Sequence, residues 1–207
     1  MNTPSNGALD VQAGDETRPI MNIRGERVGL GPIRCDLIPL YCQWSNDFIF
    51  SRTTASSGPL TIEQQTALYE RVVATEDTAA FVIYDLCTGC PIGTTDLRHI
   101  NPRNRTAEFS IGIGDEAYRG KGYGMETTRL MLDFAFTVLG IHNVLLVVYE
   151  FNHAGRRAYE KAGFRECGRR RESQWMGGRL WDVIYMECLA TEFESPVLQR
   201  VFTIDGL

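Results

Sequence analysis

The feature that constrains this chain most is a glycine-rich segment, AYRGKGYGMETT, at residues 117–128. Its centre alternates glycines with other residues and carries two cations: Gly120, Gly122, Gly124, Arg119 and Lys121. Glycine loses more conformational freedom on folding than any other residue, so such a run indicates a local requirement. A strand-like stretch precedes the segment and a helix-like stretch follows it. Because backbone N–H groups at a helix N-terminus are unpaired and favour negative charge, the segment predicts a phosphate-binding loop.

Strand-like and helix-like patterns alternate along the rest of the chain. Strands are predicted at 27–34, 80–86, 92–99, 106–113, 143–150, 164–171 and 180–189. Helices are predicted at 37–47, 61–74, 125–139 and 152–161, and Thr61 and Gln64 have the spacing of a capping box. We therefore expect an α/β or α+β domain over residues 26–190, with a polar tail at 1–25 and a C-terminal tail at 191–207.

The composition argues against two broad classes of partner. The 207 residues carry a formal net charge of −5, whereas general nucleic-acid binding needs a basic surface. No apolar run approaches the roughly 20 residues of a transmembrane helix, and the N-terminus lacks the pattern of a secretory signal. We expect a cytoplasmic protein with no nucleic-acid and no membrane partner.

Six cysteines raise the question of a metal site or disulfides. Cys87 and Cys90 form a CxxC, but no second CxxC and no nearby histidine accompany it, and a zinc site needs about four ligands. Thr88 and Gly89 lie between two strand-like runs, so the segment is typical of a hairpin turn. We expect reduced structural cysteines and no metal.

Three phosphate-binding patterns compete for the glycine loop. The P-loop pattern GxxxxGK[ST] is absent. Residues 112–117, GIGDEA, match a dinucleotide fingerprint in letters, but the first glycine falls inside a predicted strand and residues 119–124 intervene before the helix. The third pattern is Arg/Gln-x-x-Gly-x-Gly/Ala, which residues 119–124 match as RGKGYG.

With this third pattern the sequence resembles the GNAT acyltransferase superfamily, over roughly residues 25–190. A second segment, NHAGRRAYEKAGF at 152–164, is similar to the family's N-x-x-A-x-x-x-Y-E-K-x-G-F motif, with Gly155 in place of the alanine. The resemblance implies a mixed, mostly antiparallel sheet of about six or seven strands, splayed between the fourth and fifth strands and flanked by about four helices.

The resemblance also implies acetyl-CoA as co-substrate and an acceptor amine that attacks the thioester directly. The loop would bind the CoA pyrophosphate through Arg119, Gly120, Lys121, Gly122, Tyr123 and Gly124. The pantetheine arm would pair with the strand at Ile111 and Ile113 and would be held by Asn152. Tyr159 matches the tyrosine that donates to the departing thiolate, a role that suits a phenol, which is neutral at pH 7.

The base that takes the ammonium proton is less defined by the motifs. Glu108 lies three residues before Ile111 on the same predicted strand. A carboxylate there either accepts the proton, binds the positive substrate, or is a solvated strand glutamate.

Residues 178–183, GRLWDV, resemble a turn and strand of the branch that includes ribosomal-protein N-terminal alanine acetyltransferases and spermidine acetyltransferases. Acceptors in this branch are protein α-amines, polyamines, amino acids or amino-group antibiotics. We expect acceptor choice to lie in the loop at 51–61 and the turn at 174–179. Aromatic residues are candidates to line the cleft there: Trp44, Phe48, Phe50, Trp175 and Trp181.

Two alternatives stay open: a CoA-binding or protein-interaction module without transfer, and an enzyme that uses another acyl-CoA. Tyr159 favours catalysis, because CoA binding alone needs no proton donor beside the sulfur. In the C-terminal tail, four apolar residues either pack on a second copy in a homodimer or fold back on their own domain: Val197, Leu198, Val201 and Phe202.

Overall fold

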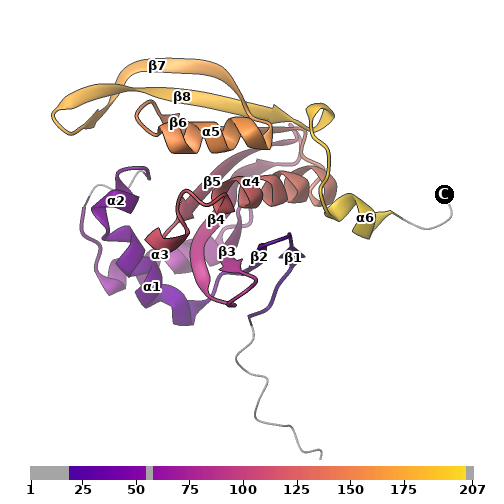
Figure 1. Ribbon diagram of the computed structural model, residues 1–207, viewed down its shortest axis with the longest axis horizontal. Helices are drawn as coiled ribbons and strands as arrows, with labels where there is room; N and C mark the ends of the chain where they lie inside the picture. Colours follow the sequence, from indigo (N-terminus) through magenta and orange to yellow (C-terminus); the bar gives the residue numbers. More distant parts are fainter. Residues whose placement is uncertain (1–18, 55–57, 204–207) are drawn as a thin grey trace, which may run out of the picture.

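A computed structural model describes residues 19–54 and 58–203, and within them the chain forms one eight-stranded sheet (Figure 1). Its order is β1-β2-β3-β4-β5-β6-β8-β7. The strands are β1 Ile23–Arg24, β2 Val28–Pro32, β3 Ala79–Asp85, β4 Pro91–Asn101, β5 Thr106–Ile113, β6 Asn143–Tyr149, β7 Arg165–Met176 and β8 Arg179–Leu189. All seven predicted strands are present. The eighth, β1, falls within the expected N-terminal tail, because two residues are too few to show an alternating pattern.

The sheet is antiparallel throughout except between β5 and β6, which run parallel. Their pairing joins Thr106–Phe109 to Asn143–Leu146 and goes no further. Beyond Phe109 the two strands separate, so the inner edge of each is left without a strand partner. The expected splay between the fourth and fifth predicted strands is therefore confirmed, since those two segments are β5 and β6.

Helices cover both faces of the sheet, as α1 Ile38–Ser45, α2 Phe48–Ser51, α3 Ile62–Ala74, α4 Tyr123–Asp133, α5 His153–Ala162 and α6 Leu198–Phe202. Alternation along β3 explains the two layers. Phe81 and Ile83 join the core under α4, whereas Val82 and Tyr84 pack with α1. In Figure 1 the group α1–α3 lies apart from α4 and α5, and the hairpin β7–β8 extends along the other side of α5. None of the helices described is long and apolar enough to cross a membrane.

Local sequence signals set several helix boundaries. Thr61 and Gln64 form the predicted capping box, with Thr61 Oγ1 accepting from the Gln64 N–H at 3.3 Å and Gln64 Oε1 from the Thr61 N–H at 2.9 Å. The helix predicted at 37–47 ends at Ser45 instead, because Asp47 takes an extended conformation and caps α2 by accepting from the Ile49 N–H at 2.9 Å. The short helix α2 lies between the predicted helix and the predicted loop, and only its last residue, Ser51, belongs to that loop.

The CxxC segment forms the turn between β3 and β4, as predicted. All six cysteines are unpaired. Within residues 19–54 and 58–203, no group of three or more His, Cys, Asp or Glu side chains is arranged to hold a metal ion.

The C-terminal segment folds back onto the domain through a buried carboxylate. Asp133, at the end of α4, is fully buried, and its Oδ2 accepts from the N–H groups of Val197 and Leu198 at 3.0 and 2.8 Å. Its Oδ1 accepts from Thr137 Oγ1 at 2.9 Å. Leu198 is buried in the core, whereas Phe202 stays 57% exposed. Of the two alternatives for the apolar tail residues, the structure shows folding back for the first two of them.

Asp133 therefore stabilises the fold by accepting from one part-buried and one buried backbone N–H group. We expect Asp133→Ala to lower the free energy of unfolding by about 2–4 kcal/mol, because both N–H groups lose their acceptor. Urea denaturation followed by circular dichroism measures the change. The control is Glu70→Ala on the exposed face of α3, which should stay within about 0.5 kcal/mol of the wild type. Equal stabilities of the two variants would refute the role of Asp133.

Candidate active site

The glycine loop leads directly into α4 and leaves the helix N-terminus uncapped. Gly120 and Gly122 have φ of +72° and +93°, a left-handed conformation that disfavours other residues. Gly122 is the N-cap of α4, and no side chain caps the helix there. The first N–H groups of α4 are thus available to a ligand, and the helix dipole makes the site favourable for an anion.

Arg119 holds the loop in place through three hydrogen bonds of its guanidinium, and its side chain is 25% exposed. Its Nε donates to the Ile113 carbonyl at 2.9 Å, and its Nη2 donates to the Gly114 carbonyl at 2.5 Å and to Asp47 Oδ2 at 3.0 Å. The Ile49 N–H and Arg119 together hold the pKa of Asp47 below its usual value. The guanidinium therefore joins the loop, the end of β5 and the start of α2.

A second set of contacts holds the loop from the β2 side. Arg27 Nη1 donates to the Lys121 carbonyl at 3.1 Å, and its guanidinium lies 4.9 Å from the centre of the Tyr123 ring. The Tyr123 hydroxyl donates to Asp85 Oδ1 at 3.0 Å. The side chain of Tyr123 is thus part of the support of the loop, while Lys121 is exposed.

The dinucleotide reading of residues 112–117 does not fit the structure. Gly112 lies within β5, and a Cβ there would come within 2.5 Å of the Phe50 ring. A Cβ on Gly114 would overlap the Trp44 ring. These glycines allow aromatic side chains to pack against the strand, so their spacing has a packing cause.

A cavity of about 480 Å³ lies between the loop, the end of β5 and α5. It brings together eight of the eleven residues predicted for the site: Ile111, Ile113, Arg119, Gly120, Gly122, Gly124, Asn152 and Tyr159. Lys121 and Tyr123 do not line this cavity, and Glu108 lines a neighbouring one.

Asn152 and Tyr159 are positioned by α5. Asn152 is the N-cap, and its Oδ1 accepts from the Gly155 N–H at 2.9 Å. A Cβ at Gly155 would come within 2.6 Å of the Asn152 side chain, so the departure from the family's alanine is coupled to the conformation of this cap. Tyr159 packs edge-on against Phe109, with ring centres 6.3 Å apart, and burial raises its pKa to about 12. Its phenol is therefore neutral at physiological pH.

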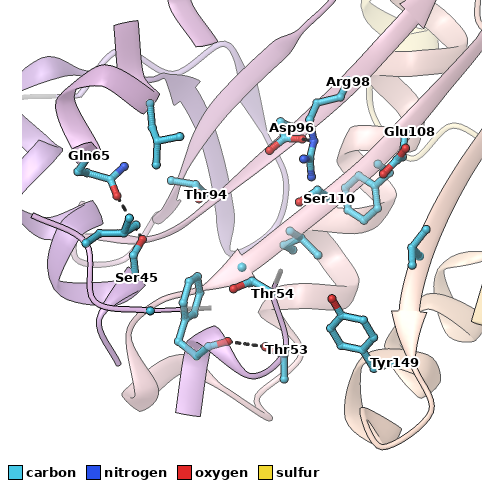
Figure 2. A pocket seen from close by; sticks show the side chains of 18 of the residues that line it. Ser45, Thr53, Thr54, Gln65, Thr94, Asp96, Arg98, Glu108, Ser110 and Tyr149 are labelled. Carbon is cyan, nitrogen blue, oxygen red and sulfur yellow. Dashed lines mark hydrogen bonds and ion pairs between the residues drawn. The ribbon is translucent and has the colours of Figure 1, made fainter. Parts of the chain in front are cut away.

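Figure 2 shows a second and larger cavity, of about 810 Å³, which Tyr159 also lines. Its wall includes hydroxyls and one amide from α1, the turn after α2, α3 and β4, among them Ser45, Thr53, Thr54, Gln65 and Thr94. Four residues line both cavities: Phe50, Thr53, Ile111 and Tyr159. The two spaces therefore meet beside the Tyr159 ring.

Three charged side chains line the larger cavity, and the strand register explains their position. Asp96 lies opposite Ser110, and Arg98 opposite Glu108, so all four point to the same face of β4 and β5. Asp96 Oδ1 accepts from Arg98 Nε at 2.7 Å. Burial raises the pKa of Asp96, and the Arg98 guanidinium opposes that shift. Glu108 forms no ion pair with the described residues.

Sequence analysis placed Glu108 in the site but missed Asp96 and Arg98. Both occupy alternate positions of a predicted strand, so the sequence predicts that they share one face of it. The sequence does not predict that this face lies beside Glu108, because that depends on the register between β4 and β5.

The predicted acceptor-side aromatics are mostly elsewhere. Phe50 lines the cavity, as expected. Trp44 is buried in the α1 core, Trp175 is 66% exposed, and Trp181 stacks on Arg179 with 3.6 Å from the guanidinium carbon to the ring centre. The exposed Phe48 does not line it either.

The two segments expected to choose the acceptor have different outcomes. From the loop at 51–61, the cavity is lined by Thr53, Thr54, Gly58, Pro59 and Leu60, and residues 55–57 lie outside the described ranges. The turn at 174–179 lines neither cavity. Its role in acceptor choice therefore stays a prediction.

Comparison with known proteins identifies the class. A family model for the acetyltransferase (GNAT) domain matches residues 27–165. Spermidine N(1)-acetyltransferase of Vibrio cholerae is 33% identical over 126 residues, which are 61% of this chain and 72% of that protein. Alpha/beta-tubulin-N-acetyltransferase 9 of Homo sapiens is 27% identical over 154 residues, which are 69% of this chain and 74% of that protein.

A solved structure agrees with the sequence matches. The crystal structure of spermidine N-acetyltransferase from Vibrio cholerae in complex with CoA and spermine has a TM-score of 0.76 and 26% identity to this chain. It covers 81% of this chain and 98% of its own. The chain therefore belongs to the GNAT acetyltransferase family and is an N-acetyltransferase, which transfers an acetyl group to an amine. The resemblance, the fold class and the reaction class inferred from the sequence are confirmed.

Proposed function

We propose that this protein binds acetyl-CoA in the smaller cavity and acetylates a primary amine of a small molecule held in the larger one. The observation that carries the proposal is that the two cavities meet at Tyr159. A thioester entering from one side and an amine from the other would come together there, which is the arrangement that direct transfer requires. The CoA and spermine bound by the Vibrio cholerae neighbour support this choice of substrates.

The residues around the smaller cavity fit CoA. The uncapped N-terminus of α4 and the loop at 119–124 supply N–H groups for the pyrophosphate. Beyond Phe109, β5 has no partner on the β6 side, so its backbone at Ile111 and Ile113 is free to pair with the amides of the pantetheine arm. Asn152 also lines this cavity and would hold that arm.

The chemical step needs a proton donor and a proton acceptor. The amine nitrogen attacks the thioester carbonyl carbon, the C–S bond breaks, and the Tyr159 hydroxyl donates its proton to the departing sulfur. The second proton that the nitrogen loses as the amide forms returns to the Tyr159 oxygen directly or through water. Glu108, which is half-buried and faces the larger cavity, accepts the ammonium proton directly or through water. The polar wall of that cavity holds the acceptor.

The location inferred from the sequence is part of the proposal. Six unpaired cysteines, two of them in an exposed CxxC, are compatible with a reducing compartment. We infer a cytoplasmic protein.

One assay distinguishes an acetyltransferase from a non-catalytic CoA-binding module and from a transferase that uses another acyl-CoA. The protein is incubated with acetyl-, propionyl- or succinyl-CoA and a panel of amines, and free thiol is measured. Amine-dependent thiol release with acetyl-CoA is the expected result. CoA binding by calorimetry without thiol release from any pair would favour the binding module.

Gly124 tests the position of the CoA pyrophosphate. A Cβ at this helical position meets only Ile113, at 4.0 Å, so Gly124→Ala leaves the fold intact. It should place a methyl group where the phosphate approaches and raise the dissociation constant of CoA about tenfold or more. Calorimetry measures the affinity, and thermal unfolding checks that stability is not reduced. Unchanged CoA affinity in a stable Gly124→Ala protein would exclude this binding mode.

Tyr159 tests the proton donor. We expect Tyr159→Phe to lower kcat about tenfold to a hundredfold while the CoA dissociation constant changes less than about threefold. Because burial raises the pKa of Tyr159 to about 12, the phenol stays protonated up to about pH 10. The ratio of wild-type to variant kcat should therefore be constant from pH 7 to 10. A ratio near one at every pH would contradict the assignment.

Glu108 tests the proton acceptor. We expect Glu108→Gln to lower kcat/KM for the amine about a hundredfold, the lower end of what general-base catalysis contributes. The matched control is Glu160→Gln, which removes an exposed carboxylate of α5 outside both cavities. Steady-state kinetics at saturating acetyl-CoA measure both. Equal rates for the two variants would assign the proton acceptor elsewhere.

A further inference from the structure

The larger cavity contains a cation that its neighbours do not fully use. Arg98 donates through Nε to Asp96, and neither of its Nη groups donates to a described residue. Its side chain is 46% exposed, on the face that lines the cavity. Figure 2 shows the guanidinium next to Asp96, on the same side of the sheet as Ser110 and with Glu108 on the adjoining strand.

The charge of the cavity does not suit a polycation. Among the described residues that line it, Asp96, Arg98 and Glu108 carry formal charge, which leaves one net negative charge. Asp96 is already bound to Arg98, so Glu108 is the one carboxylate among the described residues of this cavity that has no cationic partner. A polyamine with three ammonium groups would meet one free carboxylate and a guanidinium that repels it.

The arrangement matches a different acceptor. Arg98 and Glu108 are directly opposed residues of β4 and β5, so their Cβ atoms are about 5 Å apart. A guanidinium with free donors binds a carboxylate through parallel hydrogen bonds, and a carboxylate binds or deprotonates an amine. Two opposite charges at this spacing are complementary to a molecule with an amine and a carboxylate close together.

We propose that the acceptor is an amino acid or a similar amino carboxylate, whose carboxylate binds the Nη groups of Arg98 while its amine faces Glu108. This inference rests on the proposed acetyl transfer and specifies its acceptor. Arg98 is then the residue that determines the preference for amino acids over polyamines as acceptors. Phe50, Leu68 and Tyr149, which also line the cavity, would contact the rest of the acceptor.

The test compares amino acids with their own decarboxylation products, which differ by the carboxylate alone. The pairs are lysine and 1,5-diaminopentane, arginine and agmatine, and tyrosine and tyramine, with spermidine as the polycation. The value of kcat/KM is measured by thiol release at saturating acetyl-CoA. For each pair, the ratio of the two kcat/KM values is compared between the wild type and Arg98→Gln. The difference in amine basicity within the pair affects both proteins equally and therefore cancels.

In the wild type, at least one amino acid should be a better acceptor than its decarboxylated partner. Arg98→Gln should lower the ratio of the two kcat/KM values by about tenfold to a hundredfold, as expected for loss of a charge-assisted hydrogen-bonded pair. Arg98→Lys, which keeps the charge without the planar fork, should give an intermediate ratio. Amidation of the amino acid should reproduce the loss in the wild type and have little effect in Arg98→Gln.

Arg34 provides a matched control. It forms a similar ion pair with the residue two positions away, Nε to Asp36 Oδ1 at 2.9 Å and Nη2 to Asp36 Oδ2 at 2.8 Å, and it lines neither cavity. Arg34→Gln should leave all ratios unchanged. Thermal unfolding confirms that each variant is folded.

The outcomes distinguish this inference from the proposed function. One outcome is thiol release with diamines or spermidine but not with amino acids, at rates that Arg98→Gln leaves equal or increases. That outcome would overturn the amino-carboxylate assignment and leave the proposed acetyl transfer standing. An unchanged ratio in Arg98→Gln would overturn the role of Arg98. Absence of thiol release with every amine would overturn both.

Discussion

The separation of β5 from β6 after Phe109 is the constraint on which the rest of the site depends. Up to that residue the two strands pair in parallel, and beyond it each strand has a partner strand on one side only. A sheet gives up backbone hydrogen bonds at such a point, and the open edge then has to be satisfied by water or by a ligand. The glycine loop, the N-cap of α5 and Tyr159 all lie around this opening.

The side chains near the loop mainly determine its position. Arg119 and Arg27 each bind backbone carbonyls of the loop or of the strand before it, and Tyr123 is held by Asp85. The N–H groups and the dipole of α4 favour an anion there, and three cationic residues that line the smaller cavity add positive charge: Arg52, Arg157 and Lys161. A loop that is already held in place loses little entropy when it binds, which favours affinity.

Local signals made most of the fold predictable from the sequence. Alternation located the strands, and the caps at Thr61 and Asn152 depend on residues within one helical turn. The acceptor side was less predictable because it depends on contacts between distant segments. The pairing of Arg98 with Glu108 requires the strand register, and the solvent-exposed position of Trp175 follows from the direction of a hairpin.

The four-residue helix α2 contributes to both cavities. Its Phe50 lines both, and its N-cap Asp47 is bound to the Arg119 that holds the loop. If the larger cavity holds the amine and the smaller one CoA, as proposed, a substitution in α2 that alters one space would also alter the other. Acceptor preference and affinity for the acyl donor would then change together in variants of α2.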